Sequence, residues 1–93
     1  MCRNIRVLYN FDPPTTEEEI RAAALQYVRK VSGLTKPSAA DIETFEQAVA
    51  DVAASTRRFL SSLRARTAVR TREGERAKAR ARGERRATRS PSA

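Results

Sequence analysis

The chain has 93 residues, which allows one compact domain with a thin hydrophobic core. Hydrophobic residues make up 40% of it, but many are alanines, and the aromatic residues are two tyrosines and three phenylalanines. This composition argues against a large enclosed substrate pocket and favours binding surfaces, and the formal net charge is +8.

The residue types also limit the chemistry. The sequence contains no histidine, so it lacks the usual general base near neutral pH and the commonest metal ligand. Its single cysteine, Cys2, cannot form a disulfide within the chain or a multi-thiolate zinc site. No apolar run is long enough to span a membrane, and no signal-peptide pattern opens the chain. We therefore predict a cytoplasmic protein that is not an enzyme and that binds no metal and needs no cofactor.

The first predicted element is an extended or single-turn segment over residues 3–12. Its odd positions alternate as in a β-strand, and they are Ile5, Val7, Tyr9 and Phe11. A second reading of the same segment places Ile5, Leu8 and Phe11 on one side. A lone strand has no pairing partner, so we expect the segment to pack on the helices that follow it.

A helix is predicted over residues 16–31. Thr15 or Thr16 can cap its start, and Glu18 or Glu19 follows at the spacing of a capping box. Apolar residues then fall on one stripe of the helix: Ile20, Ala23, Ala24, Tyr27, Val28 and Val31.

A longer helix is predicted over residues 39–66, with Ser38 as its cap. Its stripe repeats at intervals of three and four residues and comprises Ile42, Phe45, Val49, Val52, Thr56, Phe59 and Leu63. The short connection makes the two helices antiparallel neighbours. We expect one shared core made of Ile20, Ala24, Tyr27, Val28, Phe45, Val49 and Val52.

The end of the longer helix extends beyond the shorter one, which leaves Phe59, Leu60 and Leu63 without a helical neighbour. We predict that Phe11 and either Leu8 or Tyr9 cover them. A symmetric partner chain is the alternative cover.

The tail carries all of the excess charge. Residues 1–63 contain eight cations and eight anions, whereas residues 64–93 contain eleven cations and three anions. Gly74 and Gly83 interrupt a segment of otherwise high helix propensity, so we expect a basic tail that is partly disordered or helical. The predicted fold is therefore all-α: a helical hairpin domain over residues 1–66 with a basic tail over residues 67–93.

Two sets of residues are candidate binding sites. The first is a candidate for protein contacts or a homodimer and comprises Cys2, Arg3, Asn4, Phe59, Leu60 and Leu63. The second is a candidate for polyanion binding and comprises Arg70, Arg72, Arg76, Lys78, Arg80, Arg82, Arg85 and Arg86. Each set also has a purely structural interpretation. The apolar residues of the first set can belong to the core of the hairpin, and the second set can be a solvated tail that aids solubility.

Several short motifs carry a resemblance. They are Met1-Cys2-Arg3-Asn4-Ile5, Asn10-Phe11 followed by Pro13-Pro14-Thr15, and the run from Glu19 to Lys30. The chain resembles a family of short, uncharacterised, mainly bacterial proteins known only as a domain of unknown function, over roughly residues 1–63. The resemblance implies no activity, and it implies that the shared role lies in residues 2–30 rather than in the tail.

We therefore expect a small binding or adaptor protein that acts through protein contacts. The first alternative is non-specific nucleic-acid binding through the arginine-rich tail. The second is a thiol-dependent activity at Cys2, because the neighbouring Arg3 would favour the thiolate.

Overall fold

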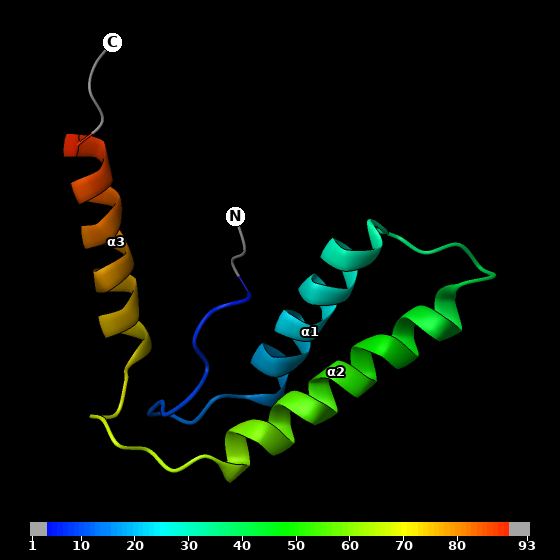
Figure 1. Ribbon diagram of the computed structural model, residues 1–93, viewed down its shortest axis with the longest axis horizontal. Coiled ribbons are helices and arrows are strands. Elements are labelled where there is room, and N and C mark those ends of the chain that lie inside the picture. Colours follow the sequence, from blue (N-terminus) through cyan, green and yellow to red (C-terminus); the bar gives the residue numbers. More distant parts are fainter. Residues whose placement is uncertain (1–3, 90–93) are drawn as a thin grey trace.

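The computed structural model describes the backbone of residues 4–89 and the side chains of residues 4–86. This part of the chain contains three helices and no strand: α1 (Glu17–Ser32), α2 (Ile42–Ser62) and α3 (Arg72–Arg89). Helices α1 and α2 lie side by side and antiparallel, and α3 projects away from them (Figure 1). The predicted all-α fold with a helical hairpin is therefore confirmed.

Helix α1 begins with the predicted capping box. The Thr16 hydroxyl accepts a hydrogen bond from the Glu19 backbone N–H at 3.1 Å, and the Glu19 carboxylate accepts one from the Thr16 N–H at 2.9 Å. Helix α1 ends at Gly33, whose φ of 73° is left-handed and suits glycine. Thr16, rather than Thr15, is thus the N-cap.

Helix α2 is shorter than the predicted range of 39–66 at both ends. Ser38 does not cap the helix, because the Asp41 N–H donates to the Ser38 carbonyl at 3.0 Å and closes a separate turn before Ile42. At the other end, Leu63 is extended, with φ −79° and ψ 151°. The extended chain after Leu63 leads to residues 67–70, which contact the N-terminal segment.

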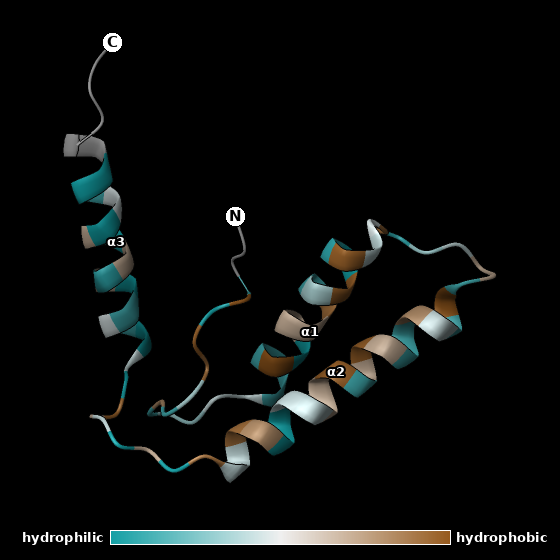
Figure 2. Ribbon diagram, in the orientation of Figure 1, coloured by the Kyte–Doolittle hydropathy of each residue, from teal (hydrophilic) through white to brown (hydrophobic). Residues whose placement is uncertain are grey.

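The core lies between α1 and α2, and hydrophobic residues recur along both helices (Figure 2). Its buried members are Leu8, Ile20, Ala24, Val28, Phe45, Val49 and Ala53. Val52 packs against this cluster while half-buried, so the predicted core is confirmed in most of its members. The prediction for Tyr27 is wrong: this residue lies at the edge of the α1 stripe and is 48% exposed.

The N-terminal segment covers the hairpin only in part. Leu8 enters the core and Leu60 packs against the core cluster, so Leu8 makes the predicted contact, while Tyr9 lies half-buried and lines the same surface as Leu60. However, Phe59 remains 62% exposed and Leu63 41% exposed, so the expectation that the segment buries them is wrong. Phe11 instead lies under a tail arginine, because the segment turns toward the tail at Asn10.

Helix α3 is continuous through the two glycines that were expected to interrupt it. Thr71 stabilises its start, since the Thr71 hydroxyl accepts a hydrogen bond from the Gly74 N–H at 2.9 Å. Alanine and arginine, which both favour helix, surround Gly83 and offset its cost of about 1 kcal/mol. Residues 90–93 of the predicted tail lie outside the described residues.

Candidate functional site

The N-terminal turn at residues 10–12 pairs with the start of the tail. Asn10 has a φ of 62°, a left-handed conformation that asparagine tolerates better than most residues. Its side-chain amide donates to the carbonyls of Thr67 and Ala68, each at 3.2 Å. The Arg70 N–H donates to the Asn10 carbonyl at 2.7 Å, and the Asp12 N–H donates to the Arg70 carbonyl at 3.0 Å. These bonds form a parallel bridge between Phe11 and Arg70.

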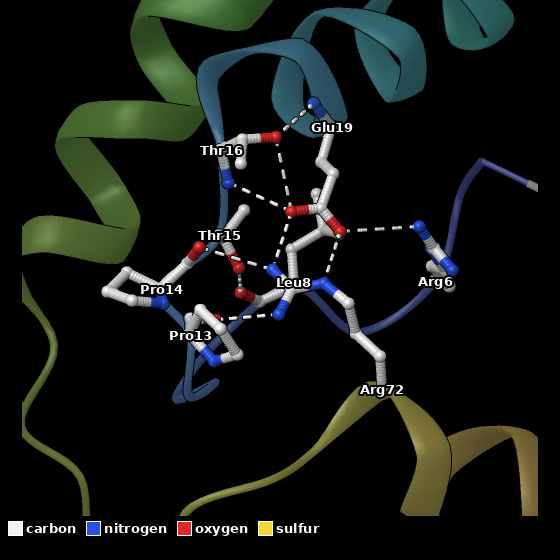
Figure 3. Close-up of polar contacts among 8 residues, drawn as sticks. All are labelled: Arg6, Leu8, Pro13, Pro14, Thr15, Thr16, Glu19 and Arg72. Atoms are coloured by element: carbon white, nitrogen blue, oxygen red, sulfur yellow. Dashed lines mark hydrogen bonds and ion pairs between the residues drawn. The ribbon is translucent and has the colours of Figure 1, made fainter.

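Arg72 completes this contact with its side chain (Figure 3). Its Nε and Nη2 donate to the two carboxylate oxygens of Glu19 at 3.0 and 2.7 Å. Its Nη1 donates to the Pro13 carbonyl at 2.7 Å, and its Nη2 to the Pro14 carbonyl at 3.2 Å. The guanidinium carbon also lies 5.2 Å from the centroid of the Phe11 ring. We call Arg72 with Phe11, Pro13, Pro14 and Glu19 the Arg72 latch.

The electrostatics of the latch exclude acid–base work near neutral pH. The hydrogen bond from Arg72, followed by the bond to the Thr16 backbone, lowers the pKa of Glu19 to about 2. Glu19 in turn raises the pKa of Arg72. Arg6 lies 3.4 Å from the same carboxylate and adds positive charge. Both latch partners are therefore ionised throughout the physiological range, and the latch joins two parts of the chain.

Arg70 and Arg72 thus differ from the other six predicted polyanion-binding residues. The Arg70 Nη1 donates to the Tyr9 carbonyl at 2.9 Å, and its Nε lies 3.2 Å from Glu75. Both arginines therefore bond to oxygens of residues 9–19, far from α3 in the sequence. The other six side chains are exposed along α3 and are Arg76, Lys78, Arg80, Arg82, Arg85 and Arg86.

A second candidate site is an apolar groove of about 420 Å³ between the N-terminal segment and the hairpin. Five large hydrophobic residues line it and remain exposed: Ile5, Val7, Tyr27, Phe59 and Leu63. Leu8 and Val52 form part of its base. The predicted interaction residues Phe59, Leu60 and Leu63 all line this groove, and we refer to it as the apolar groove.

The remaining predicted interaction residues lie near the N-terminus. Cys2 and Arg3 lie outside the described residues. The backbone N–H groups of Asn4 and Ile5 donate to the Gln26 side-chain oxygen at 2.9 and 3.1 Å. Gln26 therefore anchors the start of the described chain on α1, a role that its position outside the apolar stripe did not indicate.

The described part of the chain offers neither a metal cluster nor a membrane span. No group of three or more cysteine or acidic side chains is placed to hold a metal ion within residues 4–86. None of the three helices described is long and apolar enough to cross a membrane.

The pairing of Glu19 with Arg72 was not predicted from the sequence. Glu19 was expected in the capping box, where it also belongs, and Arg72 was expected to bind a polyanion. The available signal was the motif of Asn10-Phe11 and Pro13-Pro14-Thr15. The structure gives each part of this motif a contact, because Asn10, Phe11 and both prolines meet the tail, and the Thr15 hydroxyl donates to the Leu8 carbonyl.

Comparison with known proteins gives one family. The family model described as an uncharacterized conserved protein, DUF2277, matches residues 1–78. The match confirms the resemblance and extends it beyond the expected residue 63, so that it includes Arg70 and Arg72. No curated protein and no solved structure matches the chain.

Proposed function

We propose that this chain, which belongs to the DUF2277 family of uncharacterized conserved proteins, is a protein-interaction module that recognises a second copy of itself through the apolar groove. The exposure of Phe59 carries the proposal. An aromatic side chain that is 62% exposed beside four other exposed hydrophobic residues is typical of a contact surface.

The chain's own tail does not suit the groove. The uncharged residues of α3 within the described side chains are alanine and glycine, so the helix has no apolar face to place there. No residue of α3 lines the groove either. The described part of α3 therefore leaves the groove open to an occupant from another chain.

A second copy suits the groove for two reasons. Residues 1–63 carry equal numbers of cations and anions, so the hairpins of two copies can approach without net repulsion. The hairpin also has a thin core of seven buried residues. Two grooves that meet about a two-fold axis would bury Tyr27 and Phe59 of each copy and add a shared core.

The test compares two substitutions at exposed hydrophobic residues. Phe59→Lys alters the groove, whereas Val31→Lys alters a residue that is 67% exposed and does not line the groove. Both residues lie in the last turn of their helices, so lysine is compatible with each helix end. We expect Phe59→Lys to weaken self-association about 30-fold or more, as for a central aromatic residue in an interface, and Val31→Lys to leave it unchanged.

The measurement is sedimentation equilibrium of the full chain across micromolar concentrations. A mass that rises from one chain to two, and that depends on Phe59 but not on Val31, supports the proposal. A strictly monomeric chain, or equal weakening by both substitutions, contradicts it.

A further inference from the structure

We propose that one face of α3 binds the phosphate backbone of duplex nucleic acid, through Lys78, Arg82, Arg85 and Arg86. This site is separate from the apolar groove and does not depend on the function proposed for it. Three of its four residues lie beyond residue 78, where the family match ends. The binding site would therefore be mostly an addition of this chain to the family unit.

The charges of α3 are divided between two faces. Successive helix residues are about 100° apart, which places Lys78, Arg82, Arg85 and Arg86 within an arc of about 100°. We call this arc the basic face. The opposite face, within an arc of about 80°, carries two cations and two anions, Arg76, Arg80, Glu73 and Glu84. One side of the helix is thus strongly cationic and the other has no net charge.

The single acid on the basic face lies in the first turn. Glu75 is 3.2 Å from Arg70 and 3.8 Å from Lys78, and its side chain is only 28% exposed. Its charge is therefore largely balanced at the base of the helix. Beyond this turn, the charged residues of the basic face within the described side chains are all cations: Lys78, Arg82, Arg85 and Arg86.

The Arg72 latch fixes the start of α3, and with it the basic face, to the body of the protein. Arg72 is the first residue of α3, and its guanidinium binds Glu19 and the carbonyls of two prolines on the body of the protein. From there the 18-residue helix extends about 27 Å away from the hairpin (Figure 1). The basic face is thus held out from the hairpin on a helix, where a long rigid polyanion can reach it.

The composition of α3 favours duplex phosphates over two other anionic partners. A helix that binds a lipid surface needs large apolar side chains on one face, and α3 offers alanines and glycines. A protein that binds single strands stacks their bases on aromatic residues, and α3 has none. Arginine side chains that face phosphates need neither feature, and they bind without regard to base sequence.

The experiment measures the binding of the full 93-residue chain to labelled duplex DNA of two unrelated sequences by fluorescence anisotropy. One double variant, R82Q/R85Q, alters the basic face. The matched control, R76Q/R80Q, removes the same number of charges from the opposite face. Glutamine keeps a good helix propensity in both, which circular dichroism can verify.

We expect R82Q/R85Q to lower the affinity at least about tenfold at about 50 mM salt, and to reduce the slope of log affinity against log salt by about 2. The control should lower the affinity less than about threefold. A third variant, R82K/R85K, should retain the affinity within about threefold, because lysine keeps both charges. The two duplex sequences should bind equally.

Three outcomes would overturn the proposal. The first is that the intact chain does not bind duplex DNA at about 50 mM salt, where phosphate contacts are strong. The second is equal loss in R82Q/R85Q and R76Q/R80Q, which would mean attraction to the total charge without a binding face. The third is tighter binding to vesicles of phosphatidylcholine and phosphatidylserine than to the duplex.

Discussion

The hairpin and α3 are held in place by different forces. Seven buried residues hold α1 and α2 together, and residues 1–63 have no net charge. Helix α3 has no buried residue among its described side chains, and polar contacts at its first turn join it to the rest of the chain. Burial of apolar side chains therefore defines the body of this protein, while a few hydrogen bonds determine the position of its basic helix.

The largest expected effect comes from a charge placed in the hairpin core. Val49 is 3% exposed, so Val49→Asp must desolvate a carboxylate or unfold the hairpin, and we expect a loss of about 3–5 kcal/mol. Ala50→Asp, at the exposed neighbouring position of α2, is the matched control and should change the stability little. Urea unfolding followed by circular dichroism measures both, and equal stability of the two variants would mean that Val49 is not core.

A smaller and local effect is expected at the latch. Arg72→Gln removes the bidentate contact with Glu19, so the backbone bridge between Asn10 and Arg70 should open more often. Hydrogen exchange should show protection of the Arg70 amide falling about tenfold or more, with little change at core amides of α2. Arg76→Gln is the control, because Arg76 has only an exposed pair with Glu73 at 3.8 Å. A similar loss in both variants would contradict the latch.

The smallest expected effect is a pH dependence of the Arg72 latch, which the apolar core of the hairpin should not share. The pKa of Glu19 is lowered from 4.5 to about 2 in the folded chain, so its ionised form stabilises the fold above the unfolded pKa. This stabilisation is present at pH 5 and above, and it is lost as the pH falls from about 4.5 through about 2. The protection factor of the Arg70 amide, which is corrected for the intrinsic pH dependence of exchange, should therefore fall over this range, and Glu19→Gln should remove that component. An unchanged profile in Glu19→Gln would assign the acid sensitivity to other carboxylates.

The hairpin could be predicted from the sequence because each of its signals is local. The stripes of α1 and α2 repeat every three or four residues, and the pairing of Thr16 with Glu19 spans three residues. The exposure of Tyr27 could not be predicted, since the apolar stripe does not reveal which of its members lies at an uncovered edge.

The Arg72 latch is the part of the candidate site that could not be predicted from the sequence. Arg72 and Glu19 are 53 residues apart, and nothing in either residue type indicates the other as its partner. Phe11 and the two prolines form a motif that is visible in the sequence. Their contacts with the tail depend on the path of the chain after Leu63, which the sequence does not indicate. The predicted polyanion residues were therefore grouped together, although Arg70 and Arg72 contact their own chain.

The distance along the chain that the latch spans has a consequence for the order of folding. The Arg72 side chain contacts the carbonyl of Pro13 across 59 residues, and closing so long a loop in an unfolded chain is entropically costly for a few exposed hydrogen bonds. Once α1 and α2 pair, the hairpin itself brings the two ends together, and only short connections remain to be ordered. The latch must therefore close after the hairpin forms. A chain still emerging from the ribosome, or one with an unfolded hairpin, would carry the same arginines but would not hold them on a positioned helix.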